Sequence, residues 1–379
     1  MKKTLFALSL VAVAASASAQ SSVTLFGVVD VGMTRGTASG TGSASKTALT
    51  SSNLNGSRLA FRGTEDLGGG MAASFWLEAG ISPDTGQGSA TNTNNQNSGS
   101  TAAPAGTQGL TFNRRSTVSL SGNWGEVRLG RDYTPQFWNI STFDPFNNNG
   151  VGATVTIFAP ALIGMAQGGL VGPLVRASNS IAYLTPPTLG GFYGWGQYFL
   201  GENLKNGAAT QNDGNSLQAR VGYAKGPFDV ALGIARITYA QTATTGDYRS
   251  WNLGGSYDFG PAKLLALYGR DARESAPELV ARPWMIGTIV PVGVGEVHAQ
   301  YSSYKTKFTG GGNGPSVTQF ALGYQHNLSK RTALYVNATH VKNTNFAPGA
   351  GYTLGGSAIG AGVTDPSSTG FDLGIRHFF

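Results

Sequence analysis

Apolar and polar residues alternate one by one along many short stretches of the chain. In the stretch 371–376, Phe371, Leu373 and Ile375 share one face, and the residues between them are polar or small. Successive side chains of a β-strand point to opposite sides, so this period of two predicts strands with one apolar and one polar face. Similar stretches occur at 23–31, 118–120, 217–223 and 230–234.

Connections of two lengths take turns between these stretches. The short ones are rich in Gly, Pro, Asn or Asp, as tight turns require. We place them at 65–70, 122–125, 186–191, 225–227, 258–262, 291–295 and 327–330. The long ones are polar or rich in glycine and include 34–55, 82–109 and 343–368. Joined in this way, about sixteen antiparallel strands would close into an all-β transmembrane barrel when the first strand pairs with the last.

The segment 151–175 does not alternate. It carries no charge and many apolar residues, and by length it could be a transmembrane helix. Pro160, Pro173 and several glycines argue against a regular helix. We therefore expect the whole connection 134–175 to be a loop folded into the barrel lumen, where protein covers it; a helix in lipid is the alternative.

The first residues have the pattern of an export signal. Lys2 and Lys3 precede an apolar run, and 17–19 form a small-residue cleavage site. We expect residues 1–19 to be removed as a signal peptide and residues 20–379 to form a single barrel domain. A membrane anchor, which is the alternative, would need a longer apolar run.

The composition suits a barrel with a lipid-facing outside and a wet inside. Charged residues make up 12 % of the chain, about half the usual ~25 %. The mean hydropathy is nevertheless only −0.09, far below that of a helical membrane protein. Because the chain has no cysteine, backbone pairing and burial alone must hold the fold.

The chain is basic, with a formal net charge of +7 that falls by two if Lys2 and Lys3 leave with the signal. Such a charge could indicate nucleic-acid binding. The basic residues are scattered, however, and we expect no nucleic-acid partner. The densest basic pairs are 114–115 and 330–331. The charge instead favours a pore that prefers anions.

Alternation places several arginines on the inward face of the strands. Those placed there by their apolar, lipid-facing neighbours are Arg58, Arg62, Arg176 and Arg220, and Arg115 joins them if its strand extends that far back. An arginine on the lipid face at the middle of the bilayer would cost ~2–4 kcal/mol, so the lumen must be polar and wet. Guanidinium groups held close together attract anions, because a passing anion relieves their repulsion. The alternative is that each arginine only solvates the lumen wall.

The sequence contains no pattern typical of catalysis or metal binding. Its histidines lack the spacing of metal ligands, and no G-x-S-x-G motif is present. The glycines at 68–70 indicate a turn, because no Walker lysine follows them. We expect no enzyme activity, no metal and no cofactor.

Short motifs follow one another from near the predicted cleavage site to the last residue. They are SVTLFG at 22–27, SRLAFRGTEDLG at 57–68, LGR at 129–131, DPF at 144–146, NSIAY at 179–183, YDFG at 257–260, LSKRT at 328–332 and GIRHFF at 374–379. Together they resemble the trimeric general porins of Gram-negative outer membranes, the beta-proteobacterial branch in particular.

The resemblance implies a homotrimer in outer-membrane lipid and lipopolysaccharide, with a third extracellular loop that narrows each pore. It places Arg58, Arg131 and Arg176 on the lumen wall, opposite Asp144 of the loop. It also implies that Phe379 is a signal for the outer-membrane assembly machinery. The function expected is passive diffusion of small hydrophilic solutes and ions, with a weak preference for anions.

Two features depart from the family pattern. Asp144 is the single carboxylate of the inserted loop, and because it precedes a proline it could simply be a turn former. Arg131 shares its phase with Val127 and Leu129, which would face lipid. A bulge at Gly130 would turn Arg131 inward, and on that condition we keep it among the pore residues.

Other functions stay open on the sequence alone. One is a substrate-selective channel for organic anions or phosphate, which such anions would block at low concentration. Another is an adhesin or structural barrel that binds partners through its long loops. A barrel enzyme such as a lipase would need a Ser/His pair that no motif supports.

Overall fold

The computed structural model describes residues 22–89, 109–154, 158 and 174–379. The expected signal peptide at 1–19 lies outside these residues. The strands of the structure are β1 (Ser22–Ala38), β2 (Lys46–Ser51), β3 (Arg58–Gly68), β4 (Met71–Ser82), β5 (Gln87–Gly88), β6 (Arg115–Gly122), β7 (Gly125–Tyr133), β8 (Arg176–Leu184), β9 (Phe192–Phe199), β10 (Ser216–Lys225), β11 (Phe228–Ile237), β12 (Tyr248–Asp258), β13 (Lys263–Arg273), β14 (Leu279–Ala281), β15 (Trp284–Val292), β16 (Gly295–Phe308), β17 (Asn313–Asn327), β18 (Thr332–Thr344) and β19 (Ser367–Phe378). The helix α2 (Pro135–Thr142) lies between β7 and β8. None of the helices within the described ranges is long and apolar enough to cross a membrane.

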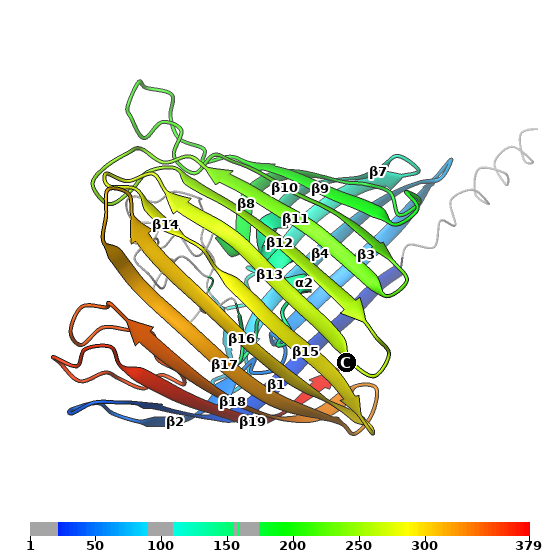
Figure 1. Cartoon of the computed structure of the whole chain (residues 1–379). Coiled ribbons are helices and arrows are strands. Elements are labelled where there is room, and N and C mark those ends of the chain that lie inside the picture. Colours follow the sequence, from blue (N-terminus) through cyan, green and yellow to red (C-terminus); the bar gives the residue numbers. More distant parts are fainter. Residues whose placement is uncertain (1–21, 90–108, 155–157, 159–173) are drawn as a thin grey trace, which may run out of the picture.

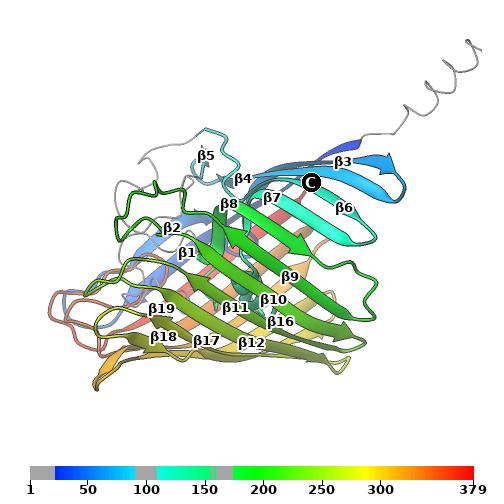
Figure 2. The same ribbon diagram turned by 90° about the horizontal axis from the view of Figure 1, so that it is seen from above.

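The strands form one closed antiparallel sheet. β1 pairs with β19, which joins the two ends of the sheet. β2 and β3 both pair with β1 and are two parts of one barrel strand, and β14 and β15 together fill one place between β13 and β16. β5 adds only a short pairing to β4. The described strands thus form the predicted sixteen-stranded barrel, with long loops at one end and short turns and the C-terminus at the other (Figure 1, Figure 2).

The seven short turns predicted from the sequence all lie between consecutive barrel strands. In the turn between β3 and β4, Gly68, Gly69 and Gly70 have φ values of 79°, 62° and 77°. Only glycine adopts this left-handed region at little cost, so the glycine run allows the tight hairpin.

The two faces of the barrel differ as the alternation predicted. On β19, Phe371, Leu373 and Ile375 are 47 %, 57 % and 47 % exposed on the outer face. Asp372, between them, is buried on the inner side and accepts a hydrogen bond from the backbone N–H of Val151 in the inserted loop at 2.7 Å. The outside is therefore suited to lipid, and the inside to polar groups.

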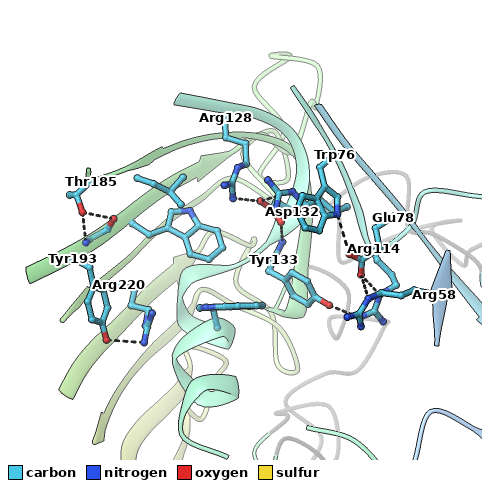
Figure 3. Close-up of a pocket in the computed structure, with 15 residues that line it drawn as sticks. Arg58, Trp76, Glu78, Arg114, Arg128, Asp132, Tyr133, Thr185, Tyr193 and Arg220 are labelled. Carbon is cyan, nitrogen blue, oxygen red and sulfur yellow. Dashed lines mark hydrogen bonds and ion pairs between the residues drawn. The ribbon is translucent and has the colours of Figure 1, made fainter. Parts of the chain in front are cut away.

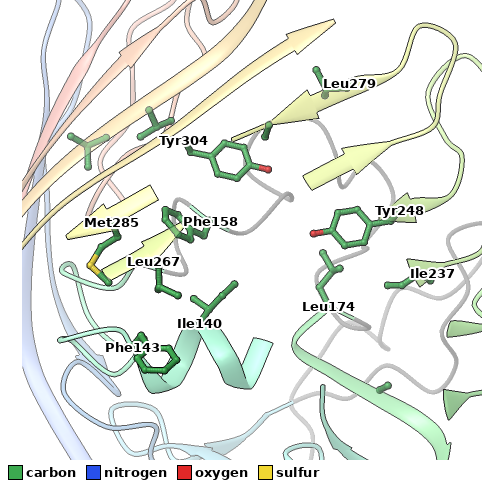
Figure 4. Packing of buried hydrophobic residues seen from close by; sticks show 14 of the residues in the cluster. Ile140, Phe143, Phe158, Leu174, Ile237, Tyr248, Leu267, Leu279, Met285 and Tyr304 are labelled. Carbon is green, nitrogen blue, oxygen red and sulfur yellow. The ribbon is translucent and has the colours of Figure 1, made fainter. Parts of the chain in front are cut away.

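The connection between β7 and β8 enters the barrel, as predicted for the third long loop. α2 packs on the inner side of β10, β11 and β12. Ile140 and Phe143 belong to an apolar cluster with Leu267, Met285 and Tyr304 of the wall (Figure 4). One side of the lumen is therefore filled with packed side chains.

The local sequence sets where α2 begins. Thr134 is the N-cap, and its hydroxyl accepts a hydrogen bond from the backbone N–H of Phe137 at 3.4 Å. Pro135 follows in the first turn, where its missing N–H is not needed. Most of the uncharged segment 151–175 lies outside the described residues. For that part, a loop in the lumen stays the prediction and a helix in lipid the alternative.

Candidate functional site

Side-chain hydrogen bonds hold α2 against the barrel wall. Gln136 donates to the hydroxyl of Ser250 at 2.9 Å, and Asn139 donates to Oδ1 of Asn252 at 2.7 Å. Arg220 donates through Nε to Oδ1 of Asn139 at 2.8 Å. These bonds fix which face of α2 meets the wall, and so fix the face that it turns to the lumen.

The segment 150–154 is attached to the wall in the same way. The hydroxyl of Thr154 donates to Oε1 of Gln300 at 2.6 Å. Gln319 donates through Nε2 to the carbonyl of Gly152 at 2.9 Å. The described part of the loop is therefore fixed to the barrel at several points.

A cavity of about 590 Å³ lies between α2 and the wall, and we call it the eyelet (Figure 3). Its charged lining residues are Arg58, Glu78, Arg114, Arg115, Arg128, Asp132 and Arg220. A second pocket shares Trp76, Arg115 and Arg128 with the eyelet and adds Arg62 and Glu126. The two together form a continuous charged path along β3, β4, β6 and β7.

One group of charges forms around Glu78 of β4. Its Oε1 accepts from Nε of Arg114 at 2.6 Å and lies 3.7 Å from Nε of Arg58. The hydroxyl of Tyr133 accepts from Arg114 and from Arg176, each at 2.7 Å. One carboxylate and one phenol therefore hold three guanidinium groups together.

A second group forms around Asp132 of β7. Its Oδ2 accepts from Nη1 of Arg128 at 2.7 Å and lies 3.7 Å from Nε of Arg115. Arg128 also donates to Glu126 at 2.9 Å. The guanidinium of Arg115 lies over the ring of Trp76, 4.6 Å from its centroid.

The site carries more positive than negative charge. The eyelet and the adjoining pocket contain six arginines and three carboxylates. Each carboxylate is bound by at least one guanidinium, and the surplus of arginines leaves the path with a net positive charge. Within the described ranges, no cluster of His, Cys, Asp or Glu side chains could hold a metal ion.

The structure brings together most of the arginines predicted from alternation. Arg58 and Arg115 line the eyelet, and Arg62 and Arg115 line the adjoining pocket. Arg176 lies beside the eyelet, with its guanidinium 4.3 Å from the ring centroid of Tyr133. Arg220 also faces the eyelet, from the opposite side of the cavity (Figure 3).

Arg131 lies at an irregular pairing, but the extra residue is on the neighbouring strand. Gly130 of β7 pairs with Ser180 and Asp132 pairs with Ala177, so β8 has one more residue in this interval than β7. Arg131 donates through Nε to the carbonyl of Asn113 at 2.6 Å, and it is not among the residues that line the eyelet. The expected bulge at Gly130 is therefore a bulge of β8, and Arg131 braces the loop before β6.

Asp144 does not face the arginines across the cavity, contrary to what the resemblance implied. Its side chain is buried within the loop and accepts from the backbone N–H groups of Phe146, Asn148 and Thr154 at 2.9, 3.1 and 2.9 Å. Burial raises the pKa of Asp144 to about 6. This geometry matches the alternative reading of Asp144 as a turn former.

Phe379 ends the chain beside the start of β1. Its backbone N–H donates to the carbonyl of Gly27 at 3.2 Å, and its carbonyl accepts from the Gly27 N–H at 3.1 Å. The ring is 40 % exposed. The terminal side chain is thus fixed by backbone pairing and accessible at the barrel's turn end.

Several residues of the eyelet were missed in the sequence. Arg128 lies between two outward apolar residues, so the same alternation places it inside. Glu78 and Asp132 meet arginines of other strands, and only the strand register shows this. Trp138 of α2 lines the eyelet from the loop side, where no periodic signal exists.

Comparison with known proteins agrees with this architecture. The sequence profile of the Gram-negative porin family matches residues 6–346. Outer membrane porin protein 32 of Delftia acidovorans is 39 % identical over 382 residues, and an outer membrane porin of Bordetella pertussis is 30 % identical over 431 residues; both alignments cover 100 % of each chain. The solved structure of the anion-selective porin from Comamonas acidovorans has a TM-score of 0.77 and 36 % identity, and covers 95 % of this chain and 100 % of that one.

These matches confirm the predicted resemblance over the full barrel. They indicate a passive channel of the outer membrane for small hydrophilic solutes, and not an enzyme. A narrowing loop fixed inside a closed barrel is the geometry that such a channel needs. The chain belongs to the Gram-negative porin family.

Proposed function

We propose that this porin passes anions in preference to cations and that the eyelet sets the preference. The observation that carries the proposal is the surplus of six arginines over three carboxylates along the path. The loop side adds no carboxylate to the eyelet, because Asp144 is buried within the loop and α2 presents Trp138 instead.

The surplus positive charge is large enough to favour anions over cations and too small to trap an anion in the pore. A unit charge ~8 Å from a passing ion contributes ~0.5 kcal/mol in water, so three surplus charges contribute ~1.5 kcal/mol before screening. About 1.4 kcal/mol corresponds to a tenfold ratio. Salt at ~0.1 M, with a Debye length of ~10 Å, reduces this by about half.

A relative supports the proposal. The Comamonas acidovorans porin, whose structure resembles this one over nearly the whole chain, is described as anion-selective. At 36 % identity and a TM-score of 0.77 the two barrels share their fold. The arginine surplus gives a physical reason why this chain would behave in the same way.

Neutralising two eyelet arginines tests the proposal. In the double variant Arg58→Gln and Arg115→Gln, Glu78 keeps Arg114 and Asp132 keeps Arg128, so each carboxylate retains a partner. We expect the reversal potential in a ~0.1 M potassium chloride gradient to move toward cation preference. The shift should shrink at 1 M, where the Debye length is ~3 Å.

Lys330→Gln provides the matched control, because Lys330 is exposed in the short turn between β17 and β18. It removes one positive charge at the turn end and should change the reversal potential much less. If the double variant and the control behaved alike, the selective site would lie elsewhere in the lumen.

We also propose a homotrimer embedded in outer-membrane lipid and lipopolysaccharide, which the outer-membrane assembly machinery inserts after reading Phe379. The apolar outer face supports the lipid contact. OmpT, an outer membrane protein of Vibrio cholerae, has been solved in a trimer form, and its TM-score of 0.62 at 13 % identity shows the shared fold alone. A heat-modifiable trimer in the outer-membrane fraction is expected; a soluble periplasmic monomer would contradict this.

A further inference from the structure

The eyelet is aromatic as well as basic, and anion preference alone does not account for the rings. Its aromatic lining residues are Trp76, Tyr133, Trp138, Tyr193 and Trp195. Hydrated chloride gains nothing from a ring face. The rings come from both sides of the cavity, since Trp138 lies on α2 and the others on the barrel wall.

Three of the rings already have a guanidinium over one face. These pairs are Arg115 over Trp76 at 4.6 Å, Arg176 over Tyr133 at 4.3 Å and Arg220 over Tyr193 at 4.6 Å. In the part of the chain that the structure describes, no guanidinium lies over Trp138 or Trp195. Both indoles line the eyelet, where a solute can contact them.

Trp138 is presented to the lumen in a fixed position. Gln136 and Asn139, on either side of it, are bonded to the wall, so α2 cannot rotate without breaking those bonds. The indole is 41 % exposed and contacts Tyr133 with ring centroids 5.2 Å apart. A ring that is ordered before binding loses little entropy when a solute stacks on it.

Charge and ring therefore lie together. The ring of Tyr133 contacts the indole of Trp138, and its hydroxyl accepts from Arg114 and Arg176, so the phenol links the indole to two guanidinium groups. Guanidinium groups bind carboxylates through paired N–H donors. The cavity volume of about 590 Å³ falls within the range of small-molecule sites, ~300–1,000 Å³.

We propose that the eyelet recognises aromatic carboxylates, with the ring against Trp138 and the carboxylate toward the wall arginines. This inference rests on the proposed anion preference and names the solute class that the same site favours. An aromatic pair adds a contribution beyond the burial of area, equivalent to roughly two- to tenfold in affinity.

The test compares benzoate with cyclohexanecarboxylate as blockers of chloride current through single channels of the full protein. Both carry one carboxylate on a six-membered ring, and only benzoate has a π face. The saturated ring is the more hydrophobic, so burial alone predicts the opposite order. We expect benzoate to halve the current at a concentration up to about tenfold lower; equal block, or stronger block by cyclohexanecarboxylate, would overturn the inference.

Two variants locate the ring. Trp138→Leu should bring the ratio of the two blocking concentrations close to one, and Trp138→Phe should restore part of it. Trp284→Leu is the matched control, because Trp284 packs against Tyr301 on the outer face and should leave the ratio unchanged. An unchanged ratio in Trp138→Leu would refute the role of this indole. If that variant failed to assemble, the ratio in Trp138→Phe would be compared with that of the unaltered channel, and an equal ratio would likewise refute the role.

The reversal potential of the same channels separates the two proposals. Chloride preference with equal block by both carboxylates would reject the aromatic inference and leave the proposed function standing. Potassium preference would reject the proposed function, and the inference with it.

Discussion

Replacing Glu78 with Gln removes one of the three carboxylates of the charged path without changing the size of the side chain. Glu78 binds Arg114 and lies near Arg58, and both arginines line the eyelet. The substitution leaves both guanidinium charges in place and removes the charge that offsets them. We expect a stronger preference for anions.

The expected size of the change follows from the geometry. An ion passing ~8 Å from position 78 in water interacts with a unit charge by ~0.5 kcal/mol. An anion gains this amount and a cation loses it, which together make ~1 kcal/mol, or about fivefold in the permeability ratio. Screening at ~0.1 M salt lowers the change to about two- to threefold, and at 1 M little should be left.

The assay is the zero-current potential of single channels under a potassium chloride gradient, measured at both salt concentrations. Asp144→Asn is the matched control, since it removes a carboxylate that lies buried in the loop and not on the eyelet. We expect it to leave the anion to cation ratio nearly unchanged. An unchanged ratio for Glu78→Gln at ~0.1 M, or an equal shift for Asp144→Asn, would refute the assignment of the selective charges.

Other changes test the loop and the assembly signal. Gly254→Val should lower single-channel conductance, because an added Cβ would lie 2.1 Å from the ring of Phe143 and push the loop into the eyelet; unchanged conductance would contradict this. Asn139→Ala should make the open-channel current noisier, as α2 loses the bonds that Asn139 makes to β11 and β12 and keeps the bond of Gln136 to β12; a current as quiet as that of the unaltered channel would argue against this anchor. Removing Phe379 should slow outer-membrane insertion in a pulse-chase experiment and leave the conductance of assembled channels unchanged, and an unaltered insertion rate would reject the signal.

Alternation along single strands was enough to predict the barrel. The phase of Leu373 and Asp372 assigns them to opposite faces, because each strand separates lipid from lumen. Clusters of glycine and proline predicted the turns, since few other residues tolerate the backbone angles of tight turns. Inward arginines such as Arg58 follow from the same phase.

Contacts between strands and within the loop could not be predicted in this way. A bulge beside Arg131 was predicted from Gly130 and the phase of β7, but its position on β8 depends on how the two strands pair. The pairing of Glu78 with Arg114 depends on which strands are neighbours. The loop has no period, so neither the burial of Asp144 nor the position of Trp138 in the eyelet could be read from residue spacing.

The reversal potential of the unaltered channel under a tenfold potassium chloride gradient near 0.1 M tests the central claim most directly. With more arginines than carboxylates along the path, the zero-current potential should lie on the chloride side of zero and move toward zero as salt rises to ~1 M. A potential on the potassium side at low salt would contradict the claim that the arginines of the eyelet govern which ions pass.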